Sequence, residues 1–365
     1  MKLSLIRACM ALSMVAVLTG CAGIRKTPEP PAAVVEVPRS HPPAVTDRFL
    51  LDTPEQRIVG ELQVIEARYE DTFVDIARTY NVGFDELAES NPDVDAWLPG
   101  EGTRIVLPTR FVLPDAPHEG IVVNLPSKRL FYFLPEPDAE GRQVVVTYPI
   151  GIGKEGTVTP VGTTTVISKA KDPVWTVPQS VLQEHAAKGD PLPARVMPGP
   201  DNPLGAYALR LGMPSYLIHG TNKPAGVGMR SSHGCLRLFP ENIAFIYESV
   251  PPGTPVRIVN QPWLFAWDNG RLYLEAHTPL SDDTRDQARL FADRFAAAME
   301  NAPDGLAQIA DARLESIREA ALGVPLPLME NEPSPPDVLA AARFVNNLVA
   351  FPEPAPELLA QQISE

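Results

Sequence analysis

Apolar residues in the middle of the chain occur in short runs and alternating stretches, a pattern that is typical of β-strands. The expected strands cover residues 121–125, 129–133, 144–148, 204–211, 216–218 and 254–259. A helix is expected from Pro240 onward, because proline is tolerated in the first turn of a helix. The pattern therefore predicts a mainly β domain over residues 117–260.

A smaller module precedes this domain, and its apolar positions change between the periods of strands and helices. The expected elements are a strand at residues 62–65, helices at 71–80 and 84–92, and a strand at 104–108. Asp71 is of a residue type that caps helix N-termini, and Pro92 would stop the second helix. The pattern predicts a small α+β domain over residues 58–110.

The C-terminal extension, residues 261–365, combines a hairpin with helices. The hairpin is expected within residues 261–280, because Asn269-Gly270 is a strong signal for a type I′ turn. Amphipathic helices are expected at residues 284–299, 306–322 and 336–349. We expect their apolar stripes, such as Phe291 and Phe295, to pack on the mainly β domain, and docking of a partner protein is the alternative.

Residues 1–20 have the features of a bacterial signal peptide, with a basic start and an apolar run too short to span a membrane. Residues 18–21, Leu-Thr-Gly-Cys, resemble a lipobox, which implies that Cys21 is lipidated. A cleaved signal peptide with an incidental cysteine is the alternative. The resemblance implies a lipoprotein anchored at the periplasmic face of a Gram-negative outer membrane. The proline-rich residues 21–57 are expected to form an extended tether.

The composition narrows the possible functions. A formal net charge of −14 over 365 residues argues against nucleic-acid binding. Of the 3 cysteines, Cys9 would leave with the signal peptide and Cys21 would carry the lipid. Cys235 would then be the one thiol of the mature chain, and an unpaired thiol in an oxidising compartment is expected to be functional.

Cys235 lies in a glycine-rich stretch that also holds two histidines and an arginine. A cysteine nucleophile needs a base, and His219 and His233 are candidates because imidazole titrates near neutral pH. Gly234 leaves the N–H groups around Cys235 open for an oxyanion hole, and Arg237 is suited to a substrate carboxylate. Each residue alone is more common in a structural role, so the prediction depends on the cluster.

Two other kinds of site match only part of the sequence. The histidines and Cys235 supply three possible zinc ligands, but no C-x-x-C pair or H-E-x-x-H helix accompanies them. Residues 151–156 match G-x-G-x-x-G, yet residues 157–168 are rich in β-branched side chains where a dinucleotide fold requires a helix. We therefore expect neither a metal nor a cofactor.

Two segments resemble the signature of the YkuD-type L,D-transpeptidases of bacterial cell walls (ErfK/YbiS/YcfS/YnhG-like). They are residues 219–221, His-Gly-Thr, and residues 232–238, Ser-His-Gly-Cys-Leu-Arg-Leu. The resemblance implies that Cys235 is the acyl-accepting nucleophile. It implies that His219 is the base and that the main-chain carbonyl of Gly220 orients it.

The same resemblance implies roles for the neighbouring residues. Ser232, His233 and Arg237 would line the site and hold substrate, and the N–H groups of Gly234 and Cys235 would form the oxyanion hole. The mainly β domain would be an L,D-transpeptidase β-sandwich.

The implied reaction is acyl transfer on peptidoglycan tetrapeptide stems. The thiolate attacks the L-centre carbonyl of diaminopimelate, D-Ala leaves, and an amine attacks the thioester. The acceptor amine would come from another stem or from a lysine of an outer-membrane lipoprotein, and water would make the protein an L,D-carboxypeptidase. A non-catalytic wall-binding lipoprotein and a thiol-redox protein are the other classes. The intact cluster argues against the first and the absence of a resolving cysteine against the second.

The small α+β domain resembles a LysM domain, a binder of N-acetylglucosamine glycans. The resemblance rests on Phe73, Ile76 and Ala77, on Asn91-Pro92 and on Leu98-Pro99-Gly100. It implies glycan binding, and a role limited to packing is the alternative.

Overall fold

The computed structural model describes residues 47–302 and 309–350. The predicted signal peptide, the lipidation site Cys21 and most of the predicted tether lie outside the described residues. In the part of the chain that the structure describes, no helix is long and apolar enough to cross a membrane.

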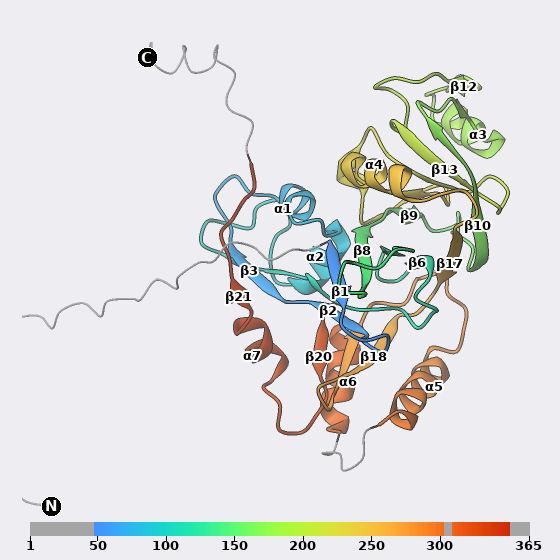
Figure 1. The fold of residues 1–365 in the computed structure, drawn as a ribbon. Coiled ribbons are helices and arrows are strands. Elements are labelled where there is room, and N and C mark those ends of the chain that lie inside the picture. The colour runs from blue at the N-terminus through green and yellow to red at the C-terminus, as the bar shows by residue number, and fades with distance from the viewer. Residues whose placement is uncertain (1–46, 303–308, 351–365) are drawn as a thin grey trace, which may run out of the picture. The chain divides into compact units, whose positions relative to one another are not determined.

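Nine strands form one sheet in the order β1-β8-β7-β6-β17-β10-β13-β14-β16, and Figure 1 labels several of them. This confirms the mainly β domain, and it places β14 and β16 at one edge of the sheet. The strands are β1 (Arg48–Leu51), β6 (Gly120–Asn124), β7 (Arg129–Phe133), β8 (Gln143–Pro149), β10 (Gly162–Lys171), β13 (Tyr207–Leu211), β14 (Leu217–His219), β16 (Leu236–Arg237) and β17 (Pro255–Val259).

The sheet curves until strands from its two halves meet. β10 pairs first with β17 and then with β13, and its register shifts between Val166 and Ser168. Gly151, just after β8, exchanges two backbone hydrogen bonds of 2.8 and 2.9 Å with Arg237 of β16. Apolar side chains from both halves, together with those of α4 (Pro240–Ser249), form one buried core. The helix begins at Pro240, as predicted.

The predicted tether is wrong over its last residues. β1 pairs antiparallel with β8, and β2 (Ile58–Gly60) pairs with β5 (Arg110–Val112). Leu51 is buried in a core that includes Val145. Residues 49–51 read Phe-Leu-Leu, so the proline-rich composition ends before this strand begins.

The small α+β domain has the predicted order of elements. They are β3 (Gln63–Glu66), α1 (Phe73–Thr79), α2 (Phe84–Ser90) and β4 (Arg104–Leu107), with β3 and β4 antiparallel. The N-cap of α1 is Thr72 rather than Asp71, because the Thr72 hydroxyl accepts from Asp75 N at 3.3 Å. The Asp71 carboxylate instead accepts from Arg68 N, which fixes the turn before the helix.

The end of the described chain completes this small domain. β21 (Arg343–Phe344) runs parallel to β3, and Val345 is buried in the core of the small domain. Tyr80 donates to Asn346 O at 2.9 Å. The helix predicted at residues 336–349 is therefore limited to α7 (Pro335–Ala340), and extended chain follows it.

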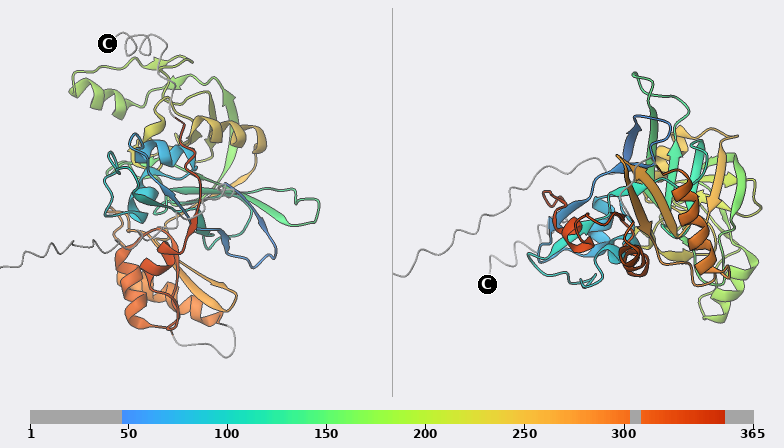
Figure 2. Two further views of the ribbon diagram at one scale, coloured as in Figure 1. Left: turned by 90° about the vertical axis from the view of Figure 1, so that its left-hand side faces the viewer. Right: turned by 90° about the horizontal axis from the view of Figure 1, so that it is seen from below.

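The hairpin of the C-terminal extension is confirmed, with Asn269 and Gly270 both at positive φ. Figure 2 shows these residues, in orange to red, gathered into a layer of their own. The helices pack on this hairpin rather than on the mainly β domain, because the hairpin offers its own apolar face: Trp263 and Phe291 lie 5.2 Å apart. The elements are β18 (Trp263–Asp268), β19 (Arg271–Ala276), α5 (Gln287–Glu300), α6 (Asp311–Ala320) and β20 (Pro325–Pro327).

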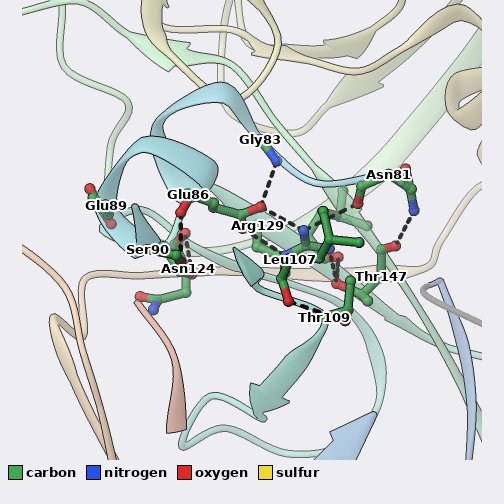
Figure 3. A network of polar contacts seen from close by, with 12 residues as sticks. Asn81, Gly83, Glu86, Glu89, Ser90, Leu107, Thr109, Asn124, Arg129 and Thr147 are labelled. Atoms are coloured by element: carbon green, nitrogen blue, oxygen red, sulfur yellow. Dashed lines mark hydrogen bonds and ion pairs between the residues drawn. The ribbon is translucent and has the colours of Figure 1, made fainter. Parts of the chain in front are cut away.

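A buried set of charges joins the small domain to the mainly β domain (Figure 3). Arg129 of β7 is 1% exposed and donates to both carboxylate oxygens of Glu86 in α2, at 2.7 and 2.6 Å. It also donates to Thr147 Oγ1 and Asn81 O, both at 3.3 Å. All these partners satisfy a guanidinium that would otherwise be costly to bury.

A second set of charges brings in the C-terminal extension. Lys128 lies 3.3 Å from Glu89 of α2, and Glu89 lies 3.4 Å from His277 Nδ1. The other ring nitrogen of His277 lies 2.8 Å from Glu275 of β19. We call Arg129, Glu86, Lys128, Glu89, His277 and Glu275 the junction cluster. Three segments that are distant in sequence therefore meet at buried ion pairs.

Candidate active site

The candidate residues gather at the edge of the sheet formed by β14 and β16. These strands are parallel, with Ile218 opposite Leu236 and His219 opposite Arg237. Cys235 directly precedes β16, so the pairing brings the thiol and the imidazole to neighbouring strands. The chain between them forms a 3₁₀ turn, η1 (Pro224–Gly226), and β15 (Arg230–Ser232), which pairs with β9 (Ile152–Gly153).

His219 is buried, and its Nδ1 lies 2.6 Å from the carbonyl oxygen of Gly220. This confirms the predicted contact, and it assigns the proton to Nδ1 because a carbonyl oxygen only accepts. Burial, and then the charge of Arg237, lowers the pKa of His219 to about 4. A Cβ on Gly220 would lie 2.9 Å from Ile243 of α4, so glycine permits this close packing.

Cys235 carries a free thiol that is partly exposed. Its Sγ lies 3.6 Å from the carbonyl oxygen of Ser215. Burial raises the pKa of this thiol, and a hydrogen bond from the Leu217 backbone and the charge of Arg237 oppose that shift. The two pKa shifts together leave Cys235 and His219 neutral at pH 7, as thiol and imidazole.

Arg237 is half-buried and acts on both groups. Its Nη1 donates to Ser231 Oγ at 3.3 Å, and Gly226 approaches so closely that a Cβ there would lie 3.1 Å from Nη1. Its Nε is buried, and no hydrogen-bond partner for it occurs among the described residues. Burial lowers the pKa of this guanidinium. A guanidinium with an unused hydrogen-bond donor is chemically suited to bind an anion.

Ser232 does not have the exposure that its predicted substrate contact requires. It is 2% exposed, its hydroxyl donates to Cys235 O at 2.7 Å, and the hydroxyl accepts from Gly234 N at 3.1 Å. Ser232 therefore closes the turn that carries the cysteine. Because the Gly234 N–H is engaged in this turn, it is not free to serve as one of the two predicted oxyanion donors.

His233 lies beside a segment whose part in the site sequence reasoning missed. Many prolines predict a loop over residues 169–202. Residues 172–203, here called the α3 segment, instead contain β11 (Trp175–Thr176), α3 (Gln179–Ala187) and β12 (Arg195–Val196) (Figure 1). Glu184 of α3 accepts from His233 Nε2 at 2.8 Å. The helical spacing of residues 179–187 was a usable signal, but the many prolines around it obscured that signal.

The partial motifs have simple structural explanations. The G-x-G-x-x-G stretch leads into β10, whereas a dinucleotide site would need a helix there. Within residues 47–302 and 309–350, no three His, Cys, Asp or Glu side chains gather closely enough to hold a metal ion.

Several known proteins are similar in sequence to a large part of this chain, including its central domain. The YkuD family model, described as the L,D-transpeptidase catalytic domain, matches residues 118–258. The chain is similar to "Probable L,D-transpeptidase YcfS" of Escherichia coli (strain K12), at 37% identity over 299 residues that cover 80% of this chain and 92% of that protein. "Probable L,D-transpeptidase YbiS" of the same strain is 43% identical over 237 residues, which cover 64% of this chain and 76% of that protein.

Among solved structures, the NMR structure of the catalytic domain from E. faecium L,D-transpeptidase is 24% identical, with a TM-score of 0.29. The match covers 40% of this chain and 100% of that one.

Proposed function

This chain belongs to the L,D-transpeptidase family with a YkuD catalytic domain, and from that premise we propose that Cys235 transfers acyl groups between peptidoglycan stems. Cys235 takes the acyl group of a tetrapeptide stem and releases D-Ala. The acceptor is the diaminopimelate amine of a second stem or a lysine of an outer-membrane lipoprotein. The observation that supports the proposal is the parallel pairing of β14 with β16, which places the buried imidazole of His219 and the segment that carries Cys235 at the same edge of the sheet.

The neutral state of both groups defines the first step. His219 accepts through Nε2, because Nδ1–H donates to Gly220 O. The thiol proton passes to Nε2 while Sγ forms a bond to the carbonyl carbon. When the tetrahedral intermediate collapses, the C–N bond breaks and the leaving D-Ala nitrogen takes the proton from Nε2. A thioester on Cys235 remains.

The second step runs the same transfers in reverse order. The acceptor amine attacks the thioester carbon and gives a proton to His219 Nε2. The C–S bond breaks, an amide forms, and Cys235 recovers its proton. The N–H of Cys235 stabilises the oxyanion in both steps, because that of Gly234 already donates to Ser232.

Arg237 binds a carboxylate of the donor stem. The buried Nε without a protein partner supports this role, since a ligand oxygen would satisfy it. Ser231 and Gly226 hold the guanidinium against the loop, so its donors have a fixed direction before substrate arrives. His233 contacts the same substrate from the α3 side of the cysteine.

The small domain and the N-terminal segment place the active site at the cell wall. The small domain binds peptidoglycan glycan, and its exposed Tyr69 and Trp97 provide aromatic surface for sugar rings. Lipidation of Cys21 anchors the protein at the periplasmic face of the outer membrane, with the proline-rich chain that follows Cys21 as spacer.

Mass spectrometry of tetrapeptide muropeptides tests the reaction. The mature protein in unlipidated form is expected to release D-Ala and form stem dimers, and Cys235→Ala is expected to do neither. Release without dimers would identify a hydrolase or an enzyme whose acceptor is a protein. An unchanged substrate with a folded protein and a titratable thiol would contradict the proposal and favour a non-catalytic wall-binding protein.

A further inference from the structure

Glu184 of α3 is surrounded by three cationic or protonatable groups. Its carboxylate lies 2.7 Å from Lys154 Nζ, 2.7 Å from Lys188 Nζ and 2.8 Å from His233 Nε2. Hydrogen bonds from these groups, that of Lys154 foremost, hold the pKa of Glu184 well below its usual range. These neighbours therefore favour the charged form of the Glu184 carboxylate.

Two of these partners belong to the chain around the cysteine. His233 is two residues before Cys235, and Lys154 directly follows β9, where its N–H donates to Ser232 O at 2.9 Å. Among the described residues, the hydrogen bonds and ion pairs that α3 makes outside the α3 segment all come from Glu184. This one carboxylate therefore makes the polar connection between α3 and the active site.

The ring of His233 needs such a partner to keep one orientation. Its side chain is 33% exposed, and it precedes Gly234, which has a φ of 103°. A charged hydrogen bond at Nε2 selects one ring orientation and directs Nδ1 away from Glu184. In the described part of the chain Nδ1 has no hydrogen-bond partner, so it is the ring atom that a substrate can contact.

We propose that Glu184 is a positioning residue, which orients His233 toward the donor stem and makes that orientation depend on the docking of α3. The inference rests on the proposed function, because it assigns His233 to donor binding. It explains why α3, which lies between β10 and β13 in the chain, directs its single carboxylate at residues that flank the cysteine. Hydrogen-bond partners that orient metal-ligating histidines typically change activity by about 10- to 100-fold when removed, and we expect an effect of similar kind here.

Steady-state kinetics of D-Ala release from the tetrapeptide tests the proposal. Glu184→Gln keeps the shape but removes the charge, and we expect kcat/KM to fall about tenfold or more. Lys188→Ala is the matched control, since it removes a partner of Glu184 that does not touch the site, and it is expected to stay within about twofold. Alkylation of Cys235 by iodoacetamide needs no donor binding and is expected to be unchanged in both variants.

A double-mutant cycle separates positioning from other effects. In a His233→Ala background, Glu184→Gln is expected to cause no further loss, because its effect passes through His233. The same loss in both backgrounds would overturn the proposal and assign the effect to Lys154. A wild-type kcat/KM in Glu184→Gln would overturn it as well.

Hydrogen exchange tests the docking without reference to activity. Glu184→Gln and His233→Ala are each expected to speed amide exchange over residues 179–187, and the two together are expected to add nothing. Unchanged exchange in the single variants would reject the docking role. If wild type releases no D-Ala while these exchange rates change as expected, the proposed function fails and the contact between Glu184 and His233 stands.

Discussion

Two histidines of this protein are almost completely buried, yet their pKa values move in opposite directions. His219, in the active site, has its pKa lowered to about 4, by burial first and then by the charge of Arg237. For His277, in the junction cluster, burial also acts to lower the pKa, but hydrogen bonds to Glu275 and Glu89 raise it to about 9. Neighbouring groups, rather than depth, decide the charge of a buried imidazole.

The difference matches what each region does. A general base must be neutral to accept a proton. Burial and the charge of Arg237 keep the ring of His219 neutral, against the opposing hydrogen bond to the carbonyl oxygen of Gly220. The junction cluster holds segments together, and a cationic His277 between two carboxylates gives charged hydrogen bonds in a dry place. If the two environments were exchanged, His219 would carry a charge and could not accept a proton, and His277 would be neutral and could not pair with the two carboxylates.

The same substitution at the two positions is expected to give opposite phenotypes, and this is the largest effect we predict. His219→Asn keeps a donor for Gly220 O but removes the base, so kcat should fall on the order of 100- to 10,000-fold while urea unfolding changes little. His277→Asn leaves Glu275 buried without its cation, so the free energy of unfolding should fall by about 3–5 kcal/mol. The kcat per folded molecule should stay the same.

Activity normalised by active-thiol titration and urea unfolding of both variants provide the measurements. A stability loss in His219→Asn as large as that in His277→Asn would remove the contrast. Near-normal turnover by His219→Asn would show that another group is the base.

The pH dependence of the free energy of unfolding also tests the contrast between His219 and His277, with a smaller expected effect. The folded pKa of His277 is about 9, above the ordinary value of 6.5, so its contribution is complete below pH 6.5 and is lost as the pH rises through 9. That contribution is about 3 kcal/mol. His219 has the opposite sign: its folded pKa is about 4, so it destabilises the fold as the pH falls from 6.5 to 4.

Denaturant midpoints between pH 4 and pH 9 should therefore reach a maximum near pH 6.5. Side-chain NMR should show His277 titrating near pH 9 and His219 near pH 4. His118 stacks on Phe133 and its pKa is also lowered to about 4, so the His219→Asn spectrum is needed to assign the signal. If the resonance of His277 titrates near pH 6.5, the junction cluster does not hold a cation there.

Sequence reasoning predicted the parts of the fold that local patterns encode. The strands around the core follow from runs of apolar residues, and the contact of His219 with Gly220 follows from a short motif. β1 was missed because it follows a proline-rich stretch. The extended end of the helix predicted at residues 336–349 was missed because its pairing partner, β3, lies at the other end of the chain.

Polar contacts between residues that are distant in sequence could not be predicted from local sequence patterns. Glu184 and His233 are 49 positions apart, and Glu86 and Arg129 are 43 apart. Charged residues are usually exposed, so nothing in the sequence marks these four as buried or paired. His277 likewise lies in no motif, so the sequence does not indicate its place in the junction cluster. The residues of the motif itself could therefore be predicted from the sequence. The residues that contact and support the motif could be identified only from the structure.

The smallest predicted effect tests whether the small domain supports the active-site loop. Gly228 lies in the loop between His219 and Cys235, and Asp85 N donates to its carbonyl oxygen at 3.3 Å. Its φ is 80°, and a Cβ would lie 2.3 Å from Gly83 Cα. Gly141→Ala is the matched control, because its φ is 81° and nothing lies within 4 Å of its Cβ.

Both alanine variants bear the cost of a left-handed backbone, about 1–2 kcal/mol, but only Gly228→Ala must also push α2 away from the loop. We therefore expect Gly228→Ala to lose about 1–3 kcal/mol more than Gly141→Ala in urea unfolding. We also expect its kcat/KM to fall several-fold, because Gly226 and Ser231 of the same loop hold Arg237. Equal losses in the two variants, with wild-type kinetics in both, would mean that the loop keeps its shape without the small domain. The junction cluster would then stabilise the chain without any influence on the site.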